Sequence, residues 1–227
     1  MVELDQEIAA VWEVIVNGDH QWLAEEIYAF NLTAERVRGF LQKPDKTIQE
    51  QAPSTILKNR IFHGSIITKG AGIIKHGEND KGIKSRWYPK TLRDRILAIG
   101  QVKHKLHFET GDAFEAIAHT KTDTNTYFFI DPPYTIAGKR LYTHFDIDHD
   151  ALFALTVQIQ GRFMLTYDDT EEIRALADKY HLRFRTTPMK TTHHIHKMNS
   201  SSPTTSPGGA RARPAALRPM PATRLRG

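Results

Sequence analysis

The stretch that decides the fold is TYFFIDPPY, residues 126–134. Residues 126–130 form an unbroken apolar and aromatic run, which ends abruptly at Asp131. A strand buried on both faces of a parallel sheet has this pattern, and its first polar residue stands at its carboxyl end. The two prolines that follow fix φ and bias Asp131 away from helical geometry. The sequence therefore predicts a central strand that delivers Asp131 to one edge of a sheet.

Helices and strands alternate on both sides of this strand, as their apolar periodicities indicate. Helices are expected at residues 6–16, 22–30, 34–41, 89–99, 112–119, 148–160 and 170–180, and further strands at residues 2–4, 107–109, 162–167 and 182–189. This alternation predicts an α/β fold with a largely parallel sheet, whose ligands bind beyond the carboxyl ends of the strands. Residues 44–53 are expected to form a linker, and residues 57–88 an irregular, functional insertion.

Length and composition restrict the class of protein. A chain of 227 residues suffices for one sizeable α/β domain with an insertion, but not for two independent cores. It contains no cysteine, so disulfides, zinc–thiolate sites and a thiol nucleophile are excluded. No apolar run is long enough to span a bilayer, and no signal peptide follows Met1. A cytoplasmic protein without a membrane partner is expected.

The net charge of +5 is unevenly distributed. Residues 58–105 hold twelve basic and three acidic residues, whereas residues 1–57 hold four basic and ten acidic ones. Residues 106–198 are also acidic, with a balance of −3. A single basic block inside an acidic domain is typical of a polyanion-binding insertion. A solvated loop with incidental lysines is the alternative.

The composition changes at residue 199. Residues 199–227 are rich in Ser, Pro, Ala and Gly, and contain five Arg and no acid. Such a segment cannot bury enough apolar surface to offset its ordering entropy, so a disordered tail is expected. A basic tether for nucleic acid and readthrough in a shifted frame are the two explanations of its composition.

The residues Asp131-Pro132-Pro133-Tyr134 match the D-P-P-Y motif of amino-methyltransferases that use S-adenosylmethionine. The chain resembles the Dam-type DNA adenine methyltransferase family over nearly all of residues 2–198. Four further stretches carry this resemblance, namely LKNRIFHG at 57–64, AGKRLY at 137–142, LTYD at 165–168 and MKTTHH at 189–194. The resemblance implies a Rossmann-like methyltransferase sheet within residues 1–198, with an inserted DNA-recognition region at about residues 57–105.

The resemblance also assigns chemistry to the motif. The exocyclic amine of adenine is a poor nucleophile, because its lone pair is delocalised into the ring. Asp131 and the carbonyl of Pro132 could accept hydrogen bonds from both amine hydrogens, which favours a pyramidal nitrogen, and Pro133 helps to hold these acceptors in place. Tyr134 would stack on a base extruded from the duplex. A Pro-Pro turn after a strand, with Asp131 as a capping residue, is the structural alternative.

The implied cofactor is S-adenosylmethionine, and the implied partner is double-stranded DNA. Glu3 matches the family's acid that binds the ribose hydroxyls, and a simple surface charge is the alternative. Asp112 matches the acid near the cofactor's adenine, and a helix N-cap is the alternative. Asp131 also borders the cofactor. The expected DNA-binding residues are Asn59, Arg60, Lys69, Lys75, Lys81, Lys84 and Arg86. No metal is expected, because the histidines at 193, 194 and 196 have no carboxylate partner nearby in the sequence.

The match fails at both ends. Family members carry a first strand and a glycine-rich loop before the acid that Glu3 matches, whereas Met1 stands two residues before Glu3. They also continue into a hydrophobic strand where residue 199 begins a polar segment. A monomeric, truncated domain of low activity is therefore expected. Two other functions stay open: a non-enzymatic relic that binds nucleic acid, and a methyltransferase that acts on RNA or protein.

Overall fold

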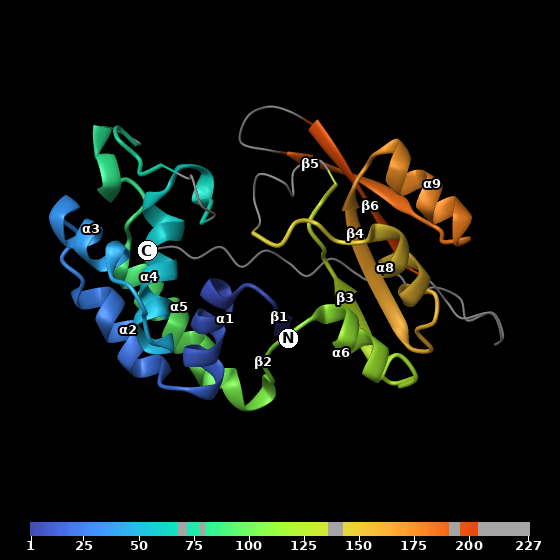
Figure 1. The fold of residues 1–227 in the computed structure, drawn as a ribbon, viewed down its shortest axis with the longest axis horizontal. Coiled ribbons are helices and arrows are strands. Elements are labelled where there is room, and N and C mark those ends of the chain that lie inside the picture. Colours follow the sequence, from blue (N-terminus) through green and yellow to red (C-terminus); the bar gives the residue numbers. More distant parts are fainter. Residues whose placement is uncertain (68–71, 78–79, 136–142, 191–195, 204–227) are drawn as a thin grey trace, which may run out of the picture.

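The computed structural model describes residues 1–67, 72–77, 80–135, 143–190 and 196–203. The chain forms a helical body followed by a body built on a sheet, and the short strands β1 and β2 lie between the two (Figure 1). The helices of the helical body are α1 (Gln6–Trp12), α2 (His20–Ala29), α3 (Ala34–Gln42), α4 (Ile48–Ile61) and α5 (Pro89–Val102), with a π-helical turn, η1 (Glu13–Asn17), after α1. The helices of the sheet body are α6 (Ala113–Thr120), α8 (His149–Thr156) and α9 (Glu171–Lys179). The mixture of helices and strands is compatible with the expected α/β class.

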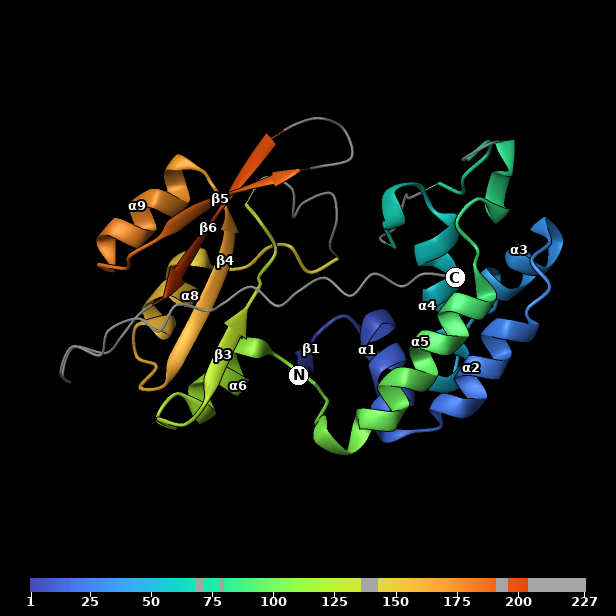
Figure 2. The ribbon, with the colours of Figure 1, turned by 180° about the vertical axis from the view of Figure 1, so that it is seen from behind.

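The strands form two separate sheets among the described residues. The smaller sheet pairs β1 (Val2–Glu3) with β2 (Glu109–Thr110) in parallel. The larger sheet has the order β3-β4-β6-β5, with β3 (Tyr127–Ile130), β4 (Arg162–Asp168), β5 (Arg185–Lys190) and β6 (His196–Pro203). Strands β3 and β4 are parallel, and β6 runs antiparallel to both of its neighbours. Figure 2, the view from behind, shows the same arrangement, with β1 between the sheet body and the helical body.

One face of the larger sheet is packed. Residues from α6, α8 and α9 join the inward side chains of β3 and β4 in one cluster of buried apolar residues. The opposite face of β3 is open, since Tyr127 and Phe129 are 55% and 62% exposed. The prediction that this strand is buried on both faces is therefore wrong for the described residues. Its apolar run ends at Asp131 as expected, but β3 is an edge strand of the larger sheet here.

The helical body has its own apolar clusters. One joins α1, α2 and α5 around Leu23, and the other joins α3 and α4 around Val37 and Leu57. Length suggested a single core, but the buried residues of the two bodies form separate clusters. The difference arises because α1 and α2, from the segment before residue 57, share an apolar cluster with α5 of the expected insertion, and α4 packs against α1.

The expected linker at residues 44–53 is largely helical. Thr47 and Glu50 form a reciprocal capping box that starts α4 at Ile48. Proline at position 53 costs one helical hydrogen bond, but Ala52 and Leu57 are almost fully buried on this helix. Capping and burial together outweigh the proline. The expectation of a linker followed by an irregular insertion is therefore wrong for residues 48–61, which form one helix.

The predicted start of the tail at residue 199 is also wrong. Residues 199–203 belong to β6, whose backbone pairs with β4 on one side and, through its first six residues, with β5 on the other. Pairing on two sides satisfies backbone groups whatever the side chains are, so a polar sequence can occupy this strand. Residues 204–227 lie outside the described residues. Among the residues that the structure describes, no helix is long and apolar enough to cross a membrane.

Candidate functional site

Asp131 follows β3 directly, at the end of the strand where the sequence places it. Its Oδ1 accepts a short hydrogen bond from the hydroxyl of Thr166, which lies on β4. Asp131 is exposed, whereas the next three residues, through Tyr134, are half-buried. The carboxylate thus points into solvent while a neighbouring strand fixes one of its oxygens.

Tyr134 packs against Tyr167 of β4, with ring centroids 6.4 Å apart and planes inclined by 34°. Tyr167 is only 1% exposed, and burial raises the pKa of its hydroxyl, with Asp168 and Glu172 adding to the effect. A hydrogen bond of 2.8 Å joins this hydroxyl to Nδ1 of His149, the first residue of α8. Two consecutive residues of β4 therefore contact the motif. Thr166 is hydrogen-bonded to Asp131, and Tyr167 packs against Tyr134.

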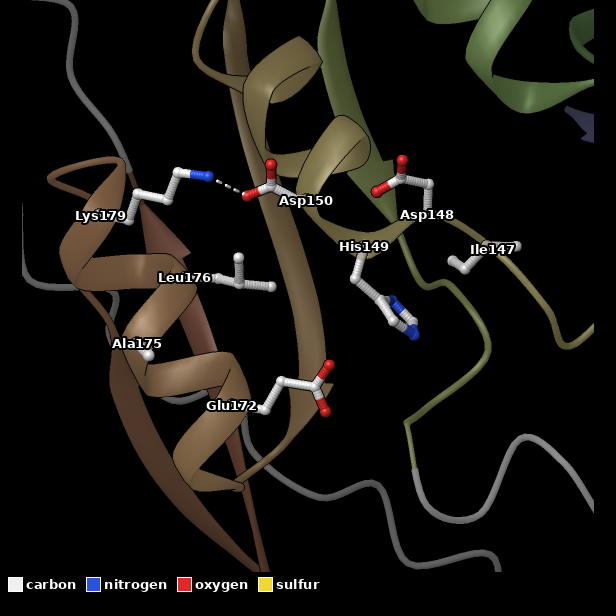
Figure 3. A pocket seen from close by; sticks show the side chains of 8 residues that line it. All are labelled: Ile147, Asp148, His149, Asp150, Glu172, Ala175, Leu176 and Lys179. Carbon is white, nitrogen blue, oxygen red and sulfur yellow. Dashed lines mark hydrogen bonds and ion pairs between the residues drawn. The ribbon is translucent and has the colours of Figure 1, made fainter.

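A cavity of about 430 Å³ lies beside this group, between the start of α8 and α9 (Figure 3). Two of its three acids are engaged with neighbouring groups. Asp148 caps α8, and Asp150 forms an ion pair of 2.6 Å with Lys179, whose ammonium lowers the pKa of that carboxyl. His149 and Glu172 line the other end of the cavity. His149, which lines the cavity, is hydrogen-bonded to Tyr167, and Tyr167 packs against Tyr134 of the motif.

Glu3 and Asp112 come together at the carboxyl ends of β1 and β2. The backbone N–H of Gly111 donates to the carbonyl oxygen of Glu3 at 3.0 Å. The Glu3 carboxylate accepts from the N–H of Asp5 at 2.9 Å, and Asp112 caps α6 by accepting from the N–H of Phe114 at 2.8 Å. The two acids thus follow neighbouring parallel strands, and Asp112 has the capping role that was its alternative explanation.

The structure divides the predicted DNA-binding residues into two groups. Lys75, Lys81 and Lys84 are exposed. Asn59 instead donates to the carbonyl of Ser65 at 3.2 Å, and Arg86 is wholly engaged in the interior of the helical body. Lys69 lies outside the described residues, as do residues 137–142 and the histidines at 193 and 194.

Arg86 holds the end of α4. Its guanidinium donates to the carbonyls of Asn59, Arg60 and Phe62 at 3.1, 3.2 and 2.5 Å, and to the Ser65 hydroxyl at 2.9 Å. Carbonyls in the last turn of a helix lack partners within the helix, so this side chain satisfies them. These four hydrogen bonds give Arg86 a structural role, and its role in DNA binding stays a prediction.

Arg60 differs from Arg86. Its Nε is buried and has no hydrogen-bond partner among the described residues. Burial lowers the pKa of this guanidinium, and the nearby charges of Arg86 and Arg95 lower it further. A half-buried cation between like charges is suited to an anion, because an anion would relieve both the unmet donor and the repulsion.

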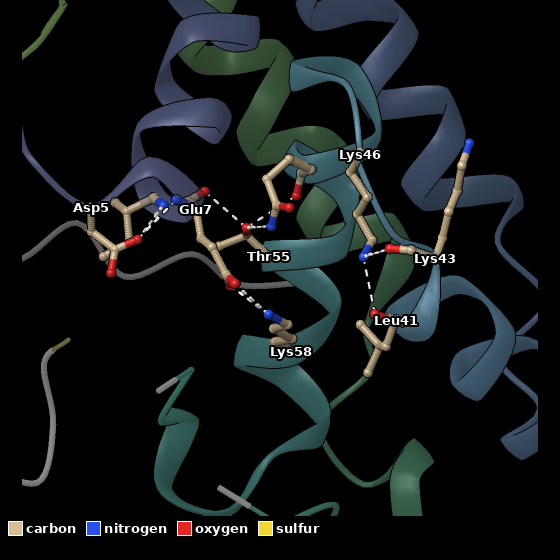
Figure 4. A network of polar contacts seen from close by, with 9 residues as sticks. Asp5, Glu7, Leu41, Lys43, Lys46, Thr55 and Lys58 are labelled. Atoms are coloured by element: carbon tan, nitrogen blue, oxygen red, sulfur yellow. Dashed lines mark hydrogen bonds and ion pairs between the residues drawn. The ribbon is translucent and has the colours of Figure 1, made fainter. Parts of the chain in front are cut away.

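Lys58 is also engaged within the helical body (Figure 4). Its ammonium lies 2.6 Å from both carboxylate oxygens of Glu7, and the Thr55 hydroxyl donates to the Glu7 carbonyl at 2.8 Å. These contacts tie α4 to α1. The net charge of the basic block therefore overstates the number of its cations that have no partner within the protein.

No protein-family model matches the chain, and no curated protein matches it either. Among the described residues, no group of three or more His, Cys, Asp or Glu is arranged to hold a metal ion.

The sequence pattern did not single out His149, and Thr166 and Tyr167 entered only as part of the matching stretch LTYD. A signal for Thr166 was present, since it is a polar residue near the end of an apolar strand. No sequence signal pairs His149 with Tyr167, because a separation of eighteen residues across a helix has no periodicity that brings two side chains together.

Proposed function

We propose that this protein is a DNA adenine methyltransferase that uses S-adenosylmethionine and methylates the exocyclic amine of an extruded adenine. The observation that carries the proposal is the position of Asp131. It follows a parallel strand directly, its carboxylate is exposed, and Thr166 fixes one of its oxygens. Pro132, Pro133 and Tyr134 follow it in the order that the D-P-P-Y motif requires.

Each group of the motif has a role in this reaction. One Asp131 oxygen is oriented by Thr166, so the carboxylate has a defined direction in which to accept a hydrogen bond from the amine. The carbonyl of Pro132 is the second acceptor, and the prolines limit its movement. The ring of Tyr134 would stack on the extruded base and hold the amine in line with the methyl donor.

The acids at the edge of β1 and β2 fit part of the cofactor. Glu3 is oriented by the N–H of Asp5, and Asp112 lies at the adjacent strand end. Carboxylates at the ends of parallel strands commonly bind ribose hydroxyls. S-adenosylmethionine, when bound, supplies an activated sulfonium methyl group. Glu3 would bind the ribose of the cofactor, and Asp112, near the start of α6, would bind its adenine. A Rossmann-like arrangement of the two sheets would direct both acids toward Asp131.

DNA would contact the helical body. Lys75, Lys81 and Lys84 are exposed and close in sequence, and Arg60 has an unmet donor. Phosphate oxygens are the natural partners of such groups, and these contacts would position the duplex without reading its sequence.

The alternative is a relic that binds nucleic acid but no cofactor. One observation favours it: among the described residues, hydrogen bonding does not join the pair β1–β2 to the larger sheet, so Glu3 and Asp131 stand on separate sheets. Cofactor binding separates the two functions.

The test is calorimetric titration of the full chain with S-adenosylmethionine, followed by transfer of a labelled methyl group to random-sequence duplex DNA. The proposal expects saturable binding, and transfer that Asp131→Ala abolishes. The matched control is Asp178→Asn, an exposed carboxylate on α9. DNA binding without cofactor binding would favour the relic, and transfer to RNA or protein in a substrate panel would change the substrate class.

A further inference from the structure

We infer that Tyr167 and His149 form a positioning pair for Tyr134, holding its ring in the orientation that receives an extruded base. The inference rests on the proposed function for the identity of the base. The restraint on the ring rests on the geometry of four aromatic side chains at the carboxyl end of β4.

Tyr167 is fixed from several sides. Its ring contacts Phe153 at a centroid distance of 5.6 Å and His149 at 5.4 Å, the latter edge to face. Its hydroxyl is tethered to His149 Nδ1 at 2.8 Å. A buried tyrosine ring with its hydroxyl tethered cannot rotate about χ1 without breaking that bond and losing these contacts.

Tyr134 depends on this surface. It follows two prolines, is half-buried, and packs with its ring 6.4 Å from that of Tyr167. The prolines restrain the backbone before it but not its own χ1. The ring of Tyr167 blocks one side of this rotation. A base that stacks on Tyr134 then meets a ring that is already ordered, so less side-chain entropy is lost on binding.

The position of His149 explains why the tether holds. Asp148 caps α8, so the backbone of His149 is fixed at the first turn of that helix. Phe153, one turn further along α8, contacts the same tyrosine ring. One helix thus supplies both the hydrogen bond and the packing that fix Tyr167.

The hydrogen bond between Tyr167 and His149 can be removed while the ring of Tyr167 and its packing are kept. Tyr167→Phe keeps the ring and removes the tether. His149→Leu removes the partner atom, whereas His149→Asn places an amide oxygen near the position of Nδ1 and serves as the conservative rescue. The full chain is labelled with 3-fluorotyrosine, and the Tyr134 resonance is assigned by Tyr134→Phe. Tyr127, exposed on β3, provides an internal control resonance.

In the ¹⁹F spectrum, Tyr167→Phe and His149→Leu should shift and narrow the Tyr134 resonance. The Tyr127 resonance should stay in place, and His149→Asn should restore the parent Tyr134 signal. A general loss of packing would move both resonances and lower the melting temperature of all three variants. An unchanged Tyr134 resonance in both Tyr167→Phe and His149→Leu overturns the inference.

A second measurement uses a thymidine oligonucleotide that carries a single 2-aminopurine, whose fluorescence is quenched by stacking. The parent chain should quench it, Tyr134→Ala should not, and Tyr167→Phe should bind about two- to tenfold more weakly, as expected from the ordering of one side chain. If the parent and Tyr134→Ala behave alike, the proposed function fails, and the ¹⁹F spectrum alone decides the restraint on the ring. If Tyr134→Ala loses quenching while Tyr167→Phe matches the parent, the positioning role fails and the proposed function stands.

Discussion

Thr166 on β4 donates a hydrogen bond to Oδ1 of Asp131 and so joins the ends of two parallel strands. Replacement by valine keeps the shape of this side chain but removes its hydroxyl. We expect Thr166→Val to lower the rate of methyl transfer about tenfold, because a hydrogen bond to a charged group contributes roughly 1.5 kcal/mol or more. Thr166→Ser keeps the hydroxyl and should retain most of the rate. Equal rates for the valine variant and the parent would show that Asp131 needs no orienting partner.

The second prediction concerns Arg86 and stability. Its four hydrogen bonds satisfy carbonyls at the end of α4 and the Ser65 hydroxyl. Arg86→Ala leaves those groups without their donor and should lower the free energy of unfolding by about 2–3 kcal/mol. Urea denaturation measures this change. Lys84→Ala, an exposed change two residues away, should stay within about 0.5 kcal/mol of the parent. A DNA-binding role without a structural one would give the opposite result, with weakened DNA binding and unchanged stability.

The position of Asp131 was predictable from the sequence because it depends on local pattern: an apolar run that stops at an acid predicts a strand end. Glu3 and Asp112 were assigned through the resemblance, and they lie at or just after the ends of β1 and β2, which pair in parallel. Helix α4 and strand β6 were not predicted. In α4 a capping box at Thr47 and burial at Leu57 prevail over the proline between them, and β6 is held by backbone pairing that a polar sequence does not reveal.

The roles of individual basic residues were not predictable. A charge count treats Arg86, Lys58 and Lys84 alike, yet the first binds helix carbonyls, the second pairs with Glu7, and the third is exposed. What distinguishes them is the set of groups that the fold brings near each side chain. The same limit applies to His149 and Tyr167, whose contact depends on how α8 packs on β4.

The third prediction tests whether residues 199–203 belong to β6. A chain that ends after Met198 loses the part of β6 that pairs with β4, from Asn199 to Pro203. Each backbone hydrogen bond contributes roughly 0.5–1.5 kcal/mol net, so this truncation should lower the free energy of unfolding by at least about 2 kcal/mol. A chain that ends after Pro203 keeps the whole ladder and should melt like the full chain. Equal melting temperatures for all three chains would contradict the assignment of residues 199–203 to β6.

The last prediction concerns the basic surface. Lys75, Lys81 and Lys84 are exposed, whereas other cations of the same block are engaged in internal contacts. Replacing the three lysines by glutamine should weaken duplex binding and reduce the slope of log K against log salt by about 0.9 for each lysine that contacts a phosphate. Arg60→Gln should reduce the slope as well if its half-buried guanidinium binds a phosphate, because the substitution removes that cation.

The control for this experiment neutralises Lys43, Lys121 and Lys179, which lie outside the basic block. It changes the net charge by the same amount, so a general electrostatic effect would lower the affinity of both triple variants equally. A reduced slope in the basic-block variant alone would place the phosphate contacts on the helical body. A slope unchanged by both triple variants and by Arg60→Gln would exclude these four residues from the DNA interface, and the arginines of residues 204–227 would then be the next group to neutralise.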